Sequence, residues 1–176
     1  MHYSTYTQAR AIKNQPHLRQ SLMAERPLGI FVATMTGLAK ICADEVASTL
    51  AAAGVEAEVH LMDGLDADAL DRLDTIVIIS STYGHGDIPD NGQGFFAAIA
   101  ARATLKGTRY AVFGLGDRTY ADTFCNAGQK WDSLFADKGA IRLAPLERHD
   151  ASAGTLAEDV AVAWATRWAH QFKKAA

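Results

Sequence analysis

Two threonines and a glycine lie close together in residues 34–39, which read TMTGLA. An apolar run precedes this segment and a stretch of helical period follows it, so the segment leads from a strand into a helix. Unpaired amide groups and the helix dipole favour an anion at such a place. Of the three glycines of a dinucleotide fingerprint only Gly37 is present, and a P-loop's leading glycine and trailing hydroxyl are missing. The segment therefore suits one terminal phosphate, with Thr36 as a simple helix N-cap as the alternative.

Two later segments each combine glycines with a tyrosine. Residues 80–91 read SSTYGHGDIPDN, and residues 114–120 read GLGDRTY. Glycines let a ligand approach the main chain closely, and Tyr83 and Tyr120 can each offer an aromatic face to a planar ring. A surface loop with a stray tyrosine is the alternative for the first of them. Together with the phosphate segment, the two tyrosines indicate a flavin mononucleotide (FMN) site.

All three segments must be positioned by the strands that precede them. The spacing of apolar residues predicts strands over 28–33, 56–62, 74–81, 109–115 and 141–146, alternating with helices over 37–53, 92–103, 124–138 and 154–173. On the first helix Ile41 is expected to face the core. This alternation is typical of an α/β fold with a doubly wound parallel sheet. Ligands of such sheets bind beyond the carboxyl ends of the strands, where the three segments lie.

Composition narrows the class of protein. The chain has 176 residues, of which 49% are hydrophobic and 21% charged, as in ordinary globular domains. A net charge of -3 gives no reason to expect nucleic acid as a partner, and no apolar run is long enough to cross a membrane. Cys42 and Cys125 fit a reduced, cytoplasmic protein, with Cys125 packing at a helix start. The six histidines show no metal-ligand spacing.

The charge divides the chain at Pro27. Residues 1–26 carry four basic side chains and one acidic one, whereas acidic side chains exceed basic ones in the remainder. We therefore expect an N-terminal basic arm over 1–26, partly ordered, and a folded domain over 27–176. The arm lacks the continuous apolar core of a secretory signal.

From residue 28 to residue 172 the sequence resembles the flavodoxin family. The likeness is strongest over 80–91, over 113–120 (FGLGDRTY) and over 124–128 (FCNAG). Within the family it is greatest to MioC-type short flavodoxins and to the FMN domains of sulfite reductase and cytochrome P450 reductase. The resemblance implies an open five-stranded parallel sheet of order 2-1-3-4-5, helices on both faces, and FMN as cofactor.

The resemblance also implies which residues hold the cofactor. The phosphate maps to the first segment, although many relatives have a hydroxyl or Asn where Leu38 stands, so one side-chain bond to phosphate is expected to be missing. Tyr83 and Tyr120 are implied to flank the ring, and an acid after the fifth strand maps to Asp150. The complete set is Thr34, Met35, Thr36, Gly37, Leu38, Ala39, Ser81, Thr82, Tyr83, Gly84, Gly86, Asp87, Leu115, Gly116, Asp117, Tyr120, Phe124, Cys125 and Asp150.

Four carboxylates lie in or beside the two tyrosine-bearing segments, and Arg118 is the single cation expected to offset them. They are Asp87, Asp90, Asp117 and Asp122. Fixed negative charge disfavours a reduced flavin anion, so we expect a low potential for the second electron. The same charge is expected to steer a basic partner toward the flavin, with ordinary solubilising charge as the alternative.

No nucleophile and base are paired in the sequence, so we assign no catalytic residue and leave the chemistry to the flavin. The resemblance implies a carrier of single electrons, fed by an NAD(P)H-dependent flavoprotein or a ferredoxin-type reductase and discharged by a redox enzyme. The alternative is an NAD(P)H-dependent flavin or quinone reductase using the same site. A phospho-receiver is disfavoured because Ser80, Ser81 and Thr82 stand where it needs an acid.

Overall fold

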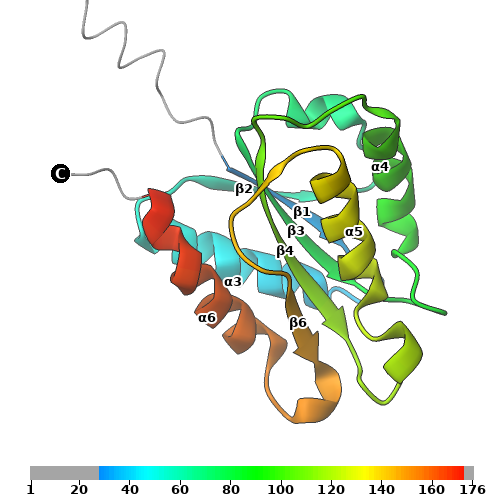
Figure 1. Ribbon diagram of the computed structural model, residues 1–176. Coiled ribbons are helices and arrows are strands. Elements are labelled where there is room, and N and C mark those ends of the chain that lie inside the picture. Colours follow the sequence, from blue (N-terminus) through cyan, green and yellow to red (C-terminus); the bar gives the residue numbers. More distant parts are fainter. Residues whose placement is uncertain (1–27, 173–176) are drawn as a thin grey trace, which may run out of the picture.

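Parallel strands form a single twisted sheet in the computed structural model, which describes residues 28–172 (Figure 1). The strands are β1 (Leu28–Ala33), β2 (Ala57–Leu61), β3 (Thr75–Ser81), β4 (Arg109–Gly116), β5 (Ile141–Arg142) and β6 (Glu147–Asp150). Their order is β2-β1-β3-β4-β5, and β6 also pairs with β4. This is the predicted order 2-1-3-4-5. The predicted arm over 1–26 lies outside the described residues.

Helices cover both faces of the sheet. The longer ones are α3 (Leu38–Ala52), α4 (Asp90–Ala101), α5 (Asn126–Asp137) and α6 (Ala157–Ala169), and the short 3-10 turns are η1 (Ala67–Leu70), η2 (Ala121–Thr123), η3 (Ala151–Ala153) and η4 (His170–Phe172). Helices α4 and α5 lie on one face, and α3 and α6 lie on the other (Figure 1). The doubly wound α/β fold is confirmed.

Side-chain alternation along the strands builds two separate cores. Ile30 and Val32 of β1 belong to the core under α3 and α6, whereas Phe31 and Ala33 belong to the core under α4 and α5. All six residues of β1 are buried, because the strand is covered on both faces. Burying each large apolar side chain stabilises the fold by roughly 1.5–3 kcal/mol. The rigid sheet that results fixes where each strand ends.

The fifth strand position differs from the prediction. A continuous strand over 141–146 was expected, but β5 ends at Arg142 and pairing with β4 resumes only at Glu147. Pro145 interrupts the ladder because proline has no backbone N–H to donate. The sheet edge is therefore made of two short segments that lie in series along β4, and the second one ends at the carboxyl edge.

Two helix predictions also need correction. Ile41 does not face the core, since 52% of its surface is exposed and the core face of α3 is formed by Cys42, Val46 and Leu50 instead. The last helix begins at Ala157 rather than at 154, because Gly154 adopts a positive φ of 73° and Thr155 and Leu156 precede the first turn. That helix was expected to run to 173, but α6 ends at Ala169 and the 3-10 turn η4 follows to Phe172.

Candidate functional site

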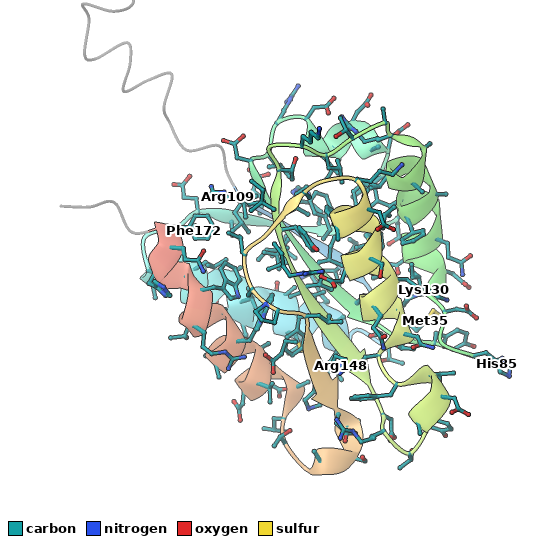
Figure 2. All side chains as sticks on the ribbon, in the orientation of Figure 1. Met35, His85, Arg109, Lys130, Arg148 and Phe172 are labelled. Carbon is teal, nitrogen blue, oxygen red and sulfur yellow. The ribbon has the colours of Figure 1, made fainter. Side chains whose placement is uncertain are left out.

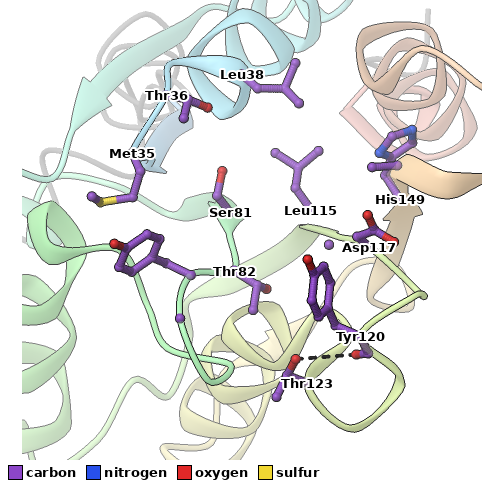
Figure 3. A pocket seen from close by; sticks show the side chains of 14 residues that line it. Met35, Thr36, Leu38, Ser81, Thr82, Leu115, Asp117, Tyr120, Thr123 and His149 are labelled. Carbon is purple, nitrogen blue, oxygen red and sulfur yellow. Dashed lines mark hydrogen bonds between the residues drawn. The ribbon is translucent and has the colours of Figure 1, made fainter.

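A cavity of about 470 Å³ opens at the carboxyl edge of the sheet (Figure 3). It lies where strand order reverses between β1 and β3, the position at which doubly wound sheets bind ligands. Its lining comes from the loops after β1, β3 and β4 and from the end of β6. The lining residues are Met35, Thr36, Leu38, Ser81, Thr82, Tyr83, Gly84, Leu115, Gly116, Asp117, Tyr120, Thr123, His149 and Ala151.

The loop after β1 has unpaired backbone amides and contributes Met35, Thr36 and Leu38 to the cavity lining. The hydroxyl of Thr34 accepts a hydrogen bond from the amide of Gly37 at 3.0 Å, and Gly37 has a φ of 92° that favours glycine. Within residues 28–172, no acceptor pairs with the amides of Met35, Thr36, Leu38 and Ala39. These groups, together with the N-terminus of α3, form a loop suited to an anion such as phosphate.

Asn91 holds that loop in place from the start of α4. Its Oδ1 accepts a hydrogen bond from the amide of Thr34 at 3.0 Å, and its Nδ2 donates to the carbonyl of Val32 at 3.2 Å. Sequence reasoning placed Asn91 only at the start of a helix. A single carboxamide that joins two segments so far apart in the chain has no local sequence signal.

The loop after β3 is closed by a short antiparallel bridge between Tyr83 and Asp87. The amide of Tyr83 donates to the Asp87 carbonyl at 2.9 Å, and the amide of Asp87 donates back at 2.7 Å. Gly84 and Gly86 take positive φ values of 53° and 91°, which allow the turn. His85 lies at its tip and points away from the molecule (Figure 2).

The loop after β4 is shaped by Asp117 and Cys125. Asp117 Oδ1 accepts hydrogen bonds from the amide of Thr119 at 2.8 Å and from its hydroxyl at 2.6 Å. Cys125 is buried with a φ of 55°, and its Sγ donates to the carbonyl of Gly114 at 3.5 Å. Burial raises the pKa of the Cys125 thiol to about 12, so this thiol stays protonated at neutral pH.

Tyr83, from the loop after β3, and Tyr120, from the loop after β4, both line the cavity. Their exposed fractions are 54% and 68%, which is unusual for large aromatic rings. Neither ring stacks on another aromatic side chain in the described part of the chain. Both rings are therefore available to a planar ligand.

The end of β6 contributes a buried histidine. His149 is 4% exposed and its Nε2 lies 3.0 Å from the carbonyl of Thr155. The neighbouring Asp150 serves the loop itself, because its Oδ1 accepts hydrogen bonds from the amides of Arg118 (2.9 Å) and Ser152 (3.0 Å). These hydrogen bonds, chiefly the one from Arg118, lower the pKa of the Asp150 carboxyl. The carboxylate fixes two loops together.

The structure brings most of the predicted residues to one cavity. Those in the lining are Met35, Thr36, Leu38, Ser81, Thr82, Tyr83, Gly84, Leu115, Gly116, Asp117 and Tyr120. Those outside the lining are Thr34, Gly37, Ala39, Gly86, Asp87, Phe124, Cys125 and Asp150. The second group shapes the loops by capping, packing or turning. Three lining residues are not in the predicted set, namely Thr123, which lies inside the loop expected to border the ring, and His149 and Ala151.

The acidic side chains near the cavity are offset more than the sequence suggested. Arg118 was expected to be the single cation among them, but Lys130 of α5 donates to Asp87 at 3.0 Å, and both side chains are partly exposed. The spacing of 43 residues between the two hid this pair from sequence reasoning. Arg118 itself pairs with Asp150 at 3.6 Å and lies over the ring of Phe124.

Within residues 28–172, no group of three or more His, Cys, Asp and Glu side chains is placed so that it could hold a metal ion. No helix in the same range is long and apolar enough to span a bilayer. The fold and the cavity, with its loop of free amides and two exposed aromatic rings, define a doubly wound α/β protein with a ligand-sized cavity at the carboxyl edge of its sheet.

Comparison with known proteins narrows the class. The family model described as flavodoxin matches residues 30–164. Flavodoxin YqcA of Escherichia coli is 34% identical over 148 residues, which cover 83% of this chain and 97% of that protein. The inducible nitric oxide synthase of Mus musculus is 34% identical over 85% of this chain but only 13% of its own length. The chain therefore belongs to the flavodoxin family.

Solved structures agree with this assignment. The C101A mutant of a flavodoxin from Pseudomonas aeruginosa superposes with a TM-score of 0.76 at 30% identity, covering 84% of this chain and 99% of that one. A Streptococcus pneumoniae flavodoxin gives a TM-score of 0.71, also at 30% identity, covering 81% and 94%.

Proposed function

We propose that this protein binds FMN in the cavity at the carboxyl edge of the sheet and carries single electrons between a reductase and an acceptor enzyme. The observation that supports this most is the convergence of three loops on one cavity, where a loop with unpaired amides and two exposed tyrosines come together. The family to which the chain belongs binds FMN.

The polar groups of the cavity fit such a ligand. Buried side-chain nitrogen or oxygen atoms without a partner occur at six of the described residues, and two of these residues line the cavity. They are Thr82, through its hydroxyl, and His149, through Nδ1. A buried polar atom without a hydrogen bond is costly, so both atoms favour a polar ligand beside them. FMN offers hydroxyls, ring N–H and carbonyl groups to such partners.

Each loop would have a separate task. The unpaired amides of Met35, Thr36, Leu38 and Ala39 would bind the phosphate, and Asn91 would hold their loop in position. The rings of Tyr83 and Tyr120 would stack on the flavin and exclude water from it. When bound, FMN supplies reversible electron transfer. Asp117, whose charge lies in the cavity lining, disfavours added negative charge there and so lowers the reduction potential.

The partner would dock where the cavity opens. Exposed apolar side chains surround that opening, with exposed fractions of 45% for Met35 and 36% for Leu38 beside the two tyrosines. Asp90 and Asp122 are exposed near the same loops, so a basic face complements the surface. Matching segments within inducible nitric oxide synthase and pyruvate dehydrogenase [NADP(+)] support a reductase as one partner.

The experiment is an anaerobic reduction of the FMN-loaded protein. NADPH alone should leave the flavin absorbance unchanged, because Tyr83 and Tyr120 would cover both faces of the bound flavin and exclude nicotinamide. Adding a catalytic amount of an NADPH-dependent flavoprotein reductase should bleach the absorbance, and the rate should fall as salt is added. Bleaching by NADPH alone would contradict a carrier and support an autonomous reductase.

A further inference from the structure

His149 is held in one orientation by contacts on both its backbone and its ring. Its backbone lies in β6, in register with Leu115 of β4, and its carbonyl accepts a hydrogen bond from Cys125 Sγ at 3.6 Å. Its Nε2 lies 3.0 Å from the carbonyl of Thr155 and 3.3 Å from the Thr155 hydroxyl. The ring is therefore positioned before any ligand arrives.

These contacts determine which ring nitrogen carries the proton. A carbonyl oxygen can only accept, so Nε2 is the protonated nitrogen and donates to Thr155. In the neutral ring Nδ1 then has a free lone pair and acts as an acceptor. No donor reaches Nδ1 from any residue that the structure describes, although the atom is buried. Buried polar atoms in folded proteins nearly always have a hydrogen-bond partner, so we expect the donor to Nδ1 to come from a bound molecule.

The position of His149 indicates where that partner comes from. The residue belongs to the cavity lining, beside Leu115 and Asp117 in the close view (Figure 3). The adjacent Asp150 cannot take its place, because the Asp150 carboxylate is already engaged by Arg118 and Ser152. Successive strand residues point to opposite sides, so the strand brings the imidazole to the cavity and the carboxylate to the loop.

We propose that His149 is a ligand-binding residue of the cavity and that its Nδ1 accepts a hydrogen bond from a donor of the bound flavin. The inference rests on the proposed binding of FMN. Two kinds of donor on FMN are suitable, the ribityl hydroxyls and the ring N3–H. The phosphate is not suitable because a phosphate dianion offers no proton to an acceptor.

Two substitutions separate this role from the bond to Thr155. In His149→Gln the side-chain amide reaches the position of Nε2, so it keeps the donor to Thr155 but leaves no acceptor at the position of Nδ1. In His149→Asn the amide reaches the position of Nδ1, so it keeps an acceptor there and loses the Thr155 contact. We expect His149→Gln to weaken FMN binding by about ten-fold or more while thermal stability changes little.

His149→Asn should show the opposite pattern, with lower stability and FMN affinity within about three-fold of the wild type. If the two affinities follow the two stabilities instead, His149 has only a structural role and the proposal is overturned. If the wild type itself binds no FMN, the proposed function fails first, and the comparison of variants is not reached.

Flavin analogues identify the donor. Lumiflavin lacks the ribityl chain, so an equal loss on His149→Gln for FMN and lumiflavin assigns N3–H, whereas a loss for FMN alone assigns a ribityl hydroxyl. No loss with either flavin overturns the proposal. If the variants do not fold, nitrogen-15 NMR of the wild type decides. The Nδ1 resonance of His149 should lie in the chemical-shift range of an unprotonated ring nitrogen both without and with FMN. It should move within that range when FMN is added, and an unchanged resonance would contradict the proposal.

Discussion

The carboxamide oxygen of Asn91 accepts a hydrogen bond from the backbone amide of Thr34 at 3.0 Å, across 57 positions of sequence. Since the same carboxamide donates to Val32 at 3.2 Å, the first turn of α4 and the loop after β1 behave as one unit. The loop that would hold a phosphate therefore takes its shape partly from the first turn of α4.

Asn91→Ala should consequently weaken both the fold and the cofactor site. The loss of two partly buried hydrogen bonds is expected to lower the free energy of unfolding by about 1–3 kcal/mol, and FMN should bind several-fold more weakly. Urea unfolding and a flavin titration measure the two effects. Gln93→Ala is the matched control, because Gln93 contacts Ile88 and Asp90 in its own segment. Wild-type FMN affinity in Asn91→Ala would show that the loop holds its shape unaided.

Gly116 has no room for a side chain. A Cβ built there would lie 2.7 Å from the backbone nitrogen of Cys125 and 2.9 Å from its Sγ. Gly116→Ala should thus displace the loop after β4, destabilise the fold by about 1–3 kcal/mol and reduce FMN binding. Thermal melting with and without FMN tests this. Gly94→Ala in α4, where a Cβ would meet nothing within 4 Å, should instead raise stability by about 0.5–1 kcal/mol.

Tyr120 is 68% exposed, so its substitution should affect the ligand far more than the fold. Tyr120→Ala removes a stacking surface worth about 0.5–1.5 kcal/mol beyond simple burial, and FMN affinity should fall by roughly two- to ten-fold. Tyr120→Phe keeps the ring and should bind like the wild type. Flavin fluorescence titrations measure both variants. Equal FMN affinities for the alanine and phenylalanine variants would show that the ring of Tyr120 does not contribute to FMN binding.

Alkaline pH should destabilise the protein. Burial, as the largest cause, raises the pKa values of the Cys42 thiol, the Cys125 thiol and the Tyr110 phenol to about 12 each. In the unfolded chain these groups lose their protons between about pH 8.5 and 10. Above this range the folded state binds more protons than the unfolded chain. The stability that the three protonated groups contribute is therefore fully present below about pH 8.5 and is lost as the pH rises toward 12.

Urea midpoints recorded between pH 8 and pH 11 would follow this loss. A Cys42→Ala/Cys125→Ala double variant should show a shallower decline over that range, whatever its stability at neutral pH. Identical slopes in the two proteins would mean that the buried thiols do not contribute.

Much of the architecture is readable from the sequence because burial on both faces leaves a strong signal. The run of β1 is apolar through its length and that of β3 through its middle, and both strands were predicted within one residue at each end. The fifth strand position was not, because Pro145 breaks a segment whose flanking residues still favour strand. A single proline decides between one strand and two.

The site was readable only where its residues are local in sequence. Glycines and tyrosines grouped within a few positions marked the loops after β3 and β4. By contrast, the roles of Asn91 and Lys130 depend on partners 57 and 43 residues away, which no local pattern records. His149 was missed because neighbouring residues of a strand point to opposite sides, so an error of one position selects the wrong side chain. The prediction chose the adjacent Asp150 instead.

The most direct test is a titration of the cofactor-free protein with FMN, followed by the quenching of flavin fluorescence, with riboflavin as the comparison. Three loops that converge on one phosphate-bearing flavin predict saturation at one FMN per chain, strong quenching, and weaker binding of riboflavin because it lacks the phosphate. Fluorescence that stays at the level of free FMN throughout the titration would contradict the central claim.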